Sequence, residues 1–248
     1  MFEYQASPDL LNDRVVLVTG AGDGIGRAAA LAYAEHGATV VLLGRTQHKL
    51  ETLYDEIIAN KWPEPVIHPL DLSKVDEPQM QQLALSLEQN CGRLDGILHN
   101  AALLGSLTPM QQYKLELWDQ VMRMNLKVPL MLSRACLPLL QQANDSAIVF
   151  TSTDSREKTT AYWGAYGVAK AAQDSLMQIL ADELETNTSI RVNAINPGPT
   201  RTRMRAVAYP GENPGTVAAP SELVSGYLYL MGPDSKDLHG QCLNVQTA

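Results

Sequence analysis

The sequence predicts an α/β fold, in which a doubly wound parallel sheet of about seven strands is flanked by helices on both faces. Short β-branched apolar runs alternate with helical patterns along the whole chain, which is the order that successive βαβ units produce. A glycine-rich turn joins the first expected strand to the first helix. No repeat, low-complexity tract or linker interrupts the 248 residues, so we expect a single domain over 1–248.

Each element follows from its local pattern. Buried parallel strands read as short runs of apolar, often β-branched residues. In chain order these runs lie at 15–18, 39–43, 66–70, 94–99, 147–151, 191–195 and, as an edge strand, 240–245. Helices read as longer segments whose apolar residues recur every three or four positions. In chain order these segments lie at 25–36, 49–60, 78–90, 115–140 and 165–186.

Glycine and proline mark several boundaries. Gly37 ends the first helix. Pro129 and Pro138 are expected to bend the 115–140 helix or to end parts of it. The stretch 196–220 contains five prolines and three glycines. An irregular stretch of this length in a compact domain indicates a lid or substrate loop.

The composition narrows the function classes. A formal net charge of −8 argues against a nucleic-acid partner, which would favour a basic surface. Cys91, Cys136 and Cys242 form no Cys-x-x-Cys pair, and no histidine lies at metal-ligand spacing. We therefore expect reduced thiols, a cytoplasmic location and no metal site. The first 14 residues lack the pattern of a secretory signal, and no apolar run is long enough to span a membrane.

The segment 19–26 reads Thr-Gly-Ala-Gly-Asp-Gly-Ile-Gly, between the first strand and the first helix. Glycines let backbone approach a pyrophosphate closely, and a helix start offers free N–H groups and the positive end of the helix dipole. The alternative is an ordinary glycine-rich turn, which the strand–turn–helix context disfavours. We expect a dinucleotide to contact Gly20, Gly22, Asp23, Gly24, Ile25 and Gly26.

The end of the second strand discriminates between nicotinamide cofactors. An acid at this point accepts hydrogen bonds from a free ribose 2′-OH and repels a 2′-phosphate. The sequence has Gly44-Arg45 here, and the guanidinium of Arg45 could bind the phosphate in a bidentate manner. The alternative is a solvated arginine at a helix start, and the acidic Asp23 in the glycine turn counts against NADP(H). The arginine and the missing acid favour NADP(H) over NAD(H).

Tyr166 and Lys170 open a helix at positions i and i+4, so the phenol and the ammonium project from one face. A tyrosine with a pKa of about 10 is a poor base at neutral pH. A nearby cation favours the phenolate and lowers its pKa. The alternative is an ordinary i,i+4 surface pair, which the register with the glycine turn disfavours.

The spacing Gly20-x-x-x-Gly24-x-Gly26, together with Tyr166 and Lys170, resembles the short-chain dehydrogenase/reductase family over nearly the whole chain. The likeness is greatest to the single-domain branch that includes uncharacterised bacterial oxidoreductases, and it implies a Rossmann-like fold. It also implies that Tyr166 is the general acid/base and that Lys170 also binds the nicotinamide ribose. Further cofactor contacts implied by the resemblance are Asp71, Leu72, Asn100, Ala101, Ala102, Pro197, Gly198 and Thr202. Ala102 stands where the family pattern has glycine.

The resemblance implies two more catalytic residues. A hydroxyl is expected thirteen residues before Tyr166, which is Thr153, where the family usually has serine; Ser152 is its neighbour. Either could donate to a substrate carbonyl, and strand alternation allows only one to reach the site. Both stay candidates, with Thr153 favoured by register. The fourth residue is Asn125, within the 115–140 helix, whose kink holds a proton-relaying water in the family.

These expectations combine into one function. We expect hydride transfer between NADP(H) and a small-molecule carbonyl or alcohol, with Tyr166 as the proton donor or acceptor. The alternatives are a catalytically silent nucleotide-binding sensor or scaffold, which usually loses the tyrosine or lysine, and an epimerase or dehydratase, which usually has a larger C-terminal domain. Apolar residues on several sides of 118–140 and 166–184 suggest a homodimer or homotetramer, in which related proteins pair these helices.

Overall fold

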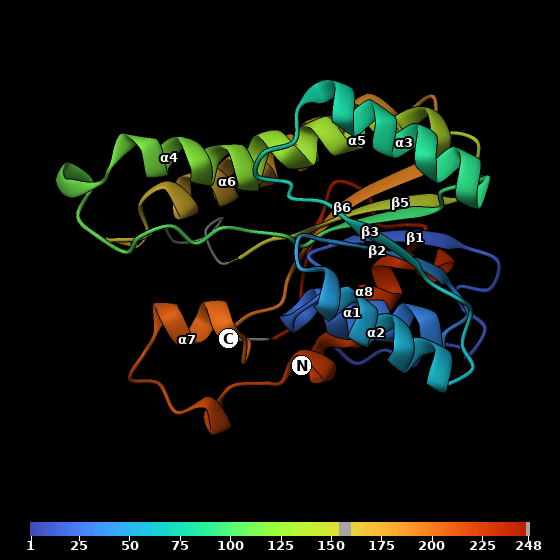
Figure 1. Ribbon diagram of the computed structural model, residues 1–248, viewed down its shortest axis with the longest axis horizontal. Coiled ribbons are helices and arrows are strands. Elements are labelled where there is room, and N and C mark those ends of the chain that lie inside the picture. The colour runs from blue at the N-terminus through green and yellow to red at the C-terminus, as the bar shows by residue number, and fades with distance from the viewer. Residues whose placement is uncertain (154–159, 247–248) are drawn as a thin grey trace.

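The computed structural model describes residues 1–153 and 160–246. In this part of the chain, seven parallel strands form one sheet in the order β3-β2-β1-β4-β5-β6-β7 (Figure 1). The strands are β1 (Val15–Thr19), β2 (Thr39–Gly44), β3 (Val66–Pro69), β4 (Gly96–His99), β5 (Ser146–Thr151), β6 (Ile190–Asn196) and β7 (Cys242–Asn244). The predicted doubly wound parallel sheet is confirmed.

The strand order reverses once, between β1 and β4. The chain proceeds outward from β1 through β2 to β3 and then returns to pair β4 with the other side of β1. In open α/β sheets the crevice outside the carboxyl ends of the strands at such a switch point is the usual ligand site. The turns after β1 and β4, which contain the predicted cofactor residues, therefore meet at one edge of the sheet.

Helices cover both faces of the sheet (Figure 1). One layer contains α1 (Gly24–Glu35), α2 (Gln47–Ala59) and α8 (Val224–Met231). The other contains α3 (Glu77–Cys91), α4 (Leu115–Met122), α5 (Val128–Leu140) and α6 (Gly164–Glu185). Strand alternation divides the core accordingly, because Val16 and Val18 pack toward α1 whereas Val15 and Leu17 pack toward α5 and α6. None of the helices in the described ranges is long and apolar enough to cross a membrane.

The expected helix at 115–140 needs correction. It consists of α4 and α5 with a π-helical turn, Arg123–Lys127, between them, in which the amide of Val128 bonds to the carbonyl of Arg123. Pro129 lies in the first turn of α5, where a missing N–H is tolerated, and Pro138 lies inside α5, which continues to Leu140. The interruption therefore surrounds Asn125, and π-turns of this kind often occur at functional sites.

The C-terminal part contains helices that the sequence did not reveal. The irregular stretch at 196–220 includes the short helix α7 (Arg203–Ala208), which Thr202 caps by accepting a hydrogen bond from the Arg205 amide. After it, α8 was not anticipated, because its eight residues are apolar on nearly every side and include Gly226. A built Cβ at Gly226 would lie 2.8 Å from a Val245 methyl, so glycine permits this helix to pack closely on the strand region.

Candidate active site

The glycine turn after β1 has the form of an anion cradle. Gly20 (φ 69°) and Gly24 (φ 53°) adopt left-handed backbone that other residues avoid. A Cβ at Gly26 would lie 2.4 Å from the Gly20 carbonyl oxygen, so this position has no room for a side chain. The turn leads into the N-terminus of α1, which Ile25 helps to pack against the core. Free N–H groups and close backbone access at a helix start suit a pyrophosphate.

Asp23, which counted against NADP(H), is paired with a cation. It caps α1 by accepting a hydrogen bond from the Gly24 amide at 2.8 Å, and it forms an ion pair with Lys49 in the first turn of α2. The hydrogen bond from Lys49 holds the pKa of Asp23 below its usual value. The Lys49 stem also lies close to Gly22. Lys49 was not among the predicted site residues, and only the packing of α2 against the glycine turn reveals it.

Arg45 lies exposed after the end of β2, near Asp71, which was predicted with Leu72 to contact the cofactor. Asp71 accepts hydrogen bonds from the Ser73 hydroxyl at 2.7 Å and the Ser73 amide at 3.1 Å. These bonds, with the nearby charges of Lys74 and Arg45, hold the pKa of Asp71 below its usual value. Leu72 is buried. The ends of β2 and β3 therefore bring Arg45, Asp71 and Leu72 together.

The ends of β1 and β4 are joined through the hydroxyl of Thr19. It accepts hydrogen bonds from the amides of Asn100 (2.9 Å) and Ala101 (3.1 Å), and it donates to the Leu98 carbonyl. The Asn100 side chain donates to the Thr19 carbonyl at 3.3 Å. Ala101 lies so close to Gly20 that a Cβ on the glycine would be 3.1 Å from its Cα. Asn100 and Ala101 thus face the glycine turn.

Ala102 and Asn125 meet on the other side of this loop. Ala102 packs against the apolar cluster that includes Tyr166. Asn125 is fully buried in the π-turn, where its amide accepts from and donates to the backbone of Leu103, both at 2.8 Å. In the described part of the chain, the Asn125 side chain therefore bonds to Leu103 rather than to Lys170.

Tyr166 and Lys170 lie in the first two turns of α6 and are 7% and 2% exposed. The amine of Lys170 is 5.9 Å from the centre of the Tyr166 ring, and it donates to the Thr151 carbonyl (2.7 Å) and to Gln173 Oε1 (3.2 Å). The expected lowering of the phenol pKa is not found in this arrangement, because burial raises the pKa of Tyr166 above its usual value. Burial also lowers the pKa of Lys170 to about 8, against the opposing charge of Asp174.

The two candidate hydroxyls after β5 lie in different surroundings. Ser152 is 1% exposed, and its hydroxyl is directed at both oxygens of the buried Asp174 on α6, at 2.7 and 2.9 Å. Thr153 is half-buried. A serine hydroxyl committed to a buried carboxylate is not available to a substrate. Ser152 is thus committed to α6, and Thr153 stays the candidate that the register favours.

The segment after β6 closes toward the glycine turn. Gly198 has a φ of 72°, and the Gln246 amide donates to the Pro197 carbonyl at 2.7 Å. Thr202 approaches Gly24, where a built Cβ would lie 3.3 Å from its methyl group. The segment therefore brings Thr202 to the start of α1, while Gln246 holds Pro197 and Gly198.

A chain of aromatic contacts runs from Tyr166 through Trp163 to Tyr209. Trp163 has its ring centre 5.7 Å from that of Tyr166 and 6.1 Å from that of Tyr209, which follows α7. Arg205 stacks over Tyr209 at 3.7 Å and makes two 2.7 Å hydrogen bonds to Glu212. Arg205 is thus committed to Tyr209 and Glu212, and it is Trp163 that lies next to the phenol.

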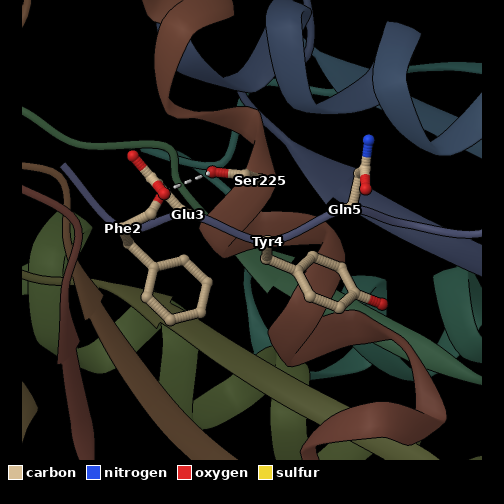
Figure 2. Close-up of a pocket in the computed structure, with 5 residues that line it drawn as sticks. All are labelled: Phe2, Glu3, Tyr4, Gln5 and Ser225. Atoms are coloured by element: carbon tan, nitrogen blue, oxygen red, sulfur yellow. Dashed lines mark hydrogen bonds between the residues drawn. The ribbon is translucent and has the colours of Figure 1, made fainter.

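In the described part of the chain, this site contains no cluster of metal ligands, and the depression at the N-terminal segment lies apart from it. Among the described residues, no group of three or more histidine, cysteine or acidic side chains could hold a metal ion. A shallow depression of about 460 Å³ is lined by Phe2, Glu3, Tyr4, Gln5 and Ser225 (Figure 2). It includes none of the predicted site residues, and the Ser225 hydroxyl donates to the Phe2 carbonyl there at 3.2 Å, which fixes the N-terminal segment on α8.

The family follows from comparison with known proteins. The family model described as short chain dehydrogenase matches residues 14–213. The chain belongs to this family of oxidoreductases. The resemblance drawn from the glycine spacing and the Tyr166–Lys170 pair is thereby confirmed. The uncharacterized oxidoreductase YciK of Escherichia coli K12 is 45% identical over 243 residues, which are 98% of this chain and 96% of YciK.

Two solved short-chain dehydrogenase structures share the fold. A protein from Shigella flexneri 2a, crystallised with NADP, is 45% identical with a TM-score of 0.94, covering 97% of this chain and 100% of that chain. A protein from Escherichia coli CFT073, crystallised with NADPH, is 45% identical with a TM-score of 0.94, covering 98% of this chain and 100% of that chain.

Proposed function

We propose that this short-chain dehydrogenase transfers a hydride between NADP(H) and a carbonyl or alcohol substrate, with Tyr166 as the general acid and base. The observation that carries the proposal is the buried Tyr166–Lys170 pair, whose lysine is bonded to the end of β5 at the sheet edge that also holds the glycine cradle. Residues 1–248 would act as one catalytic domain, with 196–220 as its lid.

The described residues fit a bound NADP(H). The left-handed Gly20 and Gly24 and the side-chain-free Gly26 let the turn fold tightly onto the start of α1, where free N–H groups would meet a phosphate. Arg45 stands directly after β2, at the position where an acid would repel a 2′-phosphate, and Lys49 offsets the charge of Asp23. The NADP and NADPH found in the Shigella and Escherichia relatives support the same choice. Asn100, Ala101 and Thr202 would line the cofactor, and Lys170 would bind its nicotinamide ribose.

The chain's own residues divide the remaining work. When bound, the nicotinamide supplies or accepts the hydride. Thr153 would donate a hydrogen bond to the substrate oxygen and stabilise its developing negative charge. Because burial raises the pKa of Tyr166, the phenol holds its proton at neutral pH and is ready to donate it in the reducing direction. Lys170, with a pKa of about 8, is cationic at pH 7 and stabilises the phenolate that remains.

The test is the Tyr166→Phe variant. It removes the proton donor and keeps the ring, so turnover of NADPH with any carbonyl substrate of the wild type should disappear. The affinity for NADPH should stay nearly unchanged, because the cradle and Lys170 are intact. NADPH oxidation against a panel of ketones, quinones and acyl carbonyls, together with fluorescence titration of NADPH, measures both. A variant that keeps the wild-type kcat would show that Tyr166 is not the acid.

A further inference from the structure

Behind the proposed site, a buried carboxylate joins α6 to the end of β5. Asp174 is 3% exposed and lies one helical turn after Lys170. Both of its oxygens accept the Ser152 hydroxyl, at 2.7 and 2.9 Å. A carboxylate is rarely buried to this extent without a specific partner, because burial costs free energy that hydrogen bonds must offset. Neither Ser152 nor Asp174 is used in the chemistry described above.

Three contacts fix the same short piece of backbone. Lys170 and Gln173 donate to the Thr151 carbonyl at 2.7 and 3.1 Å. One residue further, Ser152 donates to Asp174. The next residue is Thr153, the hydroxyl favoured for the substrate oxygen. These three contacts from α6 therefore hold the strand end that leads directly to Thr153.

We propose that Asp174 is a positioning residue, which through Ser152 fixes the end of β5 against α6 and whose buried carboxylate, one helical turn from Lys170, is the counter-charge of that ammonium. This inference rests on the proposed function, because it assigns a role to the surroundings of the same lysine and tyrosine. Substitutions can separate the two roles. Ser152 takes part only in the hydrogen bond that fixes the end of β5, which we call the tether, whereas Asp174 provides both the tether and the negative charge.

The charge effect follows from what faces Lys170. On its own helix are Tyr166, which is neutral at pH 7, and Asp174; from β4 comes His99. Burial, with the charge of Lys170, lowers the pKa of His99 to about 3, so this histidine is neutral. Among the residues that the structure describes, Asp174 is thus the charged group that counteracts the burial of Lys170. Removing its charge should lower the lysine pKa further, and the cation should then be lost at a lower pH.

The experiment compares two substitutions over pH 6–10, with NADPH and the best carbonyl of the panel. Asp174→Asn keeps an acceptor for Ser152 and removes the charge. We expect the basic limb of its kcat/KM profile to move to lower pH by about one unit, the usual effect of one opposite charge nearby. Ser152→Ala keeps the charge and removes the tether, so we expect a several-fold lower kcat with the basic limb unmoved. Asp174→Glu should restore the wild-type limb.

Asp182→Asn is the matched control, because it removes an exposed carboxylate from the same helix. The affinity for NADPH over the same pH range gives a readout that needs no turnover, since Lys170 would bind the ribose only as a cation. An Asp174→Asn profile that superimposes on the wild type in both measurements overturns the charge role. If Asp174→Asn does not fold, Ser152→Ala with wild-type kcat at every pH overturns the tether. Failure of the proposed function is distinct, because it appears as turnover in Tyr166→Phe.

Discussion

At the end of β5, two neighbouring hydroxyls differ in what they can reach, and their substitution should separate rate from stability. Thr153→Val should lower kcat by about 10²–10³, which is the usual cost of losing a donor to an oxyanion. Ser152→Ala removes a hydroxyl that bonds to buried Asp174, so it should lower the melting temperature and reduce kcat far less. Thr153→Ser should stay active because it keeps the donor.

Measuring kcat beside the melting temperature for the three variants decides this assignment. If Ser152→Ala is the slowest enzyme, the serine is the substrate donor and the register is displaced by one residue. If none of the variants is slow, the enzyme uses no hydroxyl from this strand end.

Arg45 should account for the choice of cofactor. We expect wild-type protein to bind NADPH at least about tenfold more tightly than NADH, a difference of about 1.4 kcal/mol. Arg45→Ala should remove most of this preference and leave NADH binding unchanged, because only NADPH has the 2′-phosphate. Fluorescence titration with both cofactors measures the effect, and Lys236→Ala, an exposed lysine elsewhere, controls for the loss of charge. Equal affinities in the wild type would contradict the NADP(H) assignment.

Among single residues, the sequence predicted those with local signatures and missed those whose roles depend on packing between elements. Tyr166 and Lys170 share a helix at i and i+4, and that spacing is visible without coordinates. Asp174 and Lys49 were missed, because their partners Ser152 and Asp23 lie 22 and 26 residues away in sequence and on other elements. The pKa of Tyr166 was expected to fall near a cation, but burial has the larger effect and raises it.

Among the elements, the glycine turn offers the sharpest test of the cradle. Gly26→Ala would place a Cβ 2.4 Å from the Gly20 carbonyl oxygen and 2.6 Å from the side-chain nitrogen of Asn100, so the backbone must move. We expect a loss of about 1–3 kcal/mol in unfolding free energy and weaker NADPH binding, because the cradle and Asn100 are displaced together. Thermal unfolding and NADPH titration measure both effects. Gly211→Ala, whose Cβ would meet nothing within 4 Å, should change neither; an unaffected Gly26→Ala would argue against the cradle.

Among the helices and strands, local sequence patterns predict most elements but not those that depend on tertiary contacts. The seven strands of the described ranges and α1, α2, α3 and α6 were predicted from periodicity, with ends that differ by a few residues. The π-turn around Asn125 was not predicted, because it goes with a tertiary contact: the Asn125 side-chain amide pairs with the backbone of Leu103. The helix α8 was not predicted, because its eight residues are apolar on nearly every side, with Ser225 the exception, and give no clear helical period.

For the whole molecule, the order of the strands explains how the site forms. Pairing β4 with β1 brings Asn100 to Thr19, 81 residues earlier in the chain. Alternation of strands and helices predicted a parallel sheet, yet it did not specify which strand lies beside β1. The cofactor residues could therefore be named from sequence, whereas their convergence on one sheet edge required the topology.

Exposed apolar residues on α4 and α6 predict that copies of the chain associate through these helices. Leu115 on α4 and Val168 and Ile179 on α6 are 73%, 42% and 55% exposed, and the two helices pack side by side (Figure 1). Apolar side chains gathered on one face indicate an interaction surface. We expect a homodimer or homotetramer by light scattering at micromolar concentration, and Ile179→Arg should reduce its mass. Ile58→Arg, at a 41% exposed position of α2 in the opposite layer, should leave the mass unchanged. A wild-type monomer would show that this face is simply solvated.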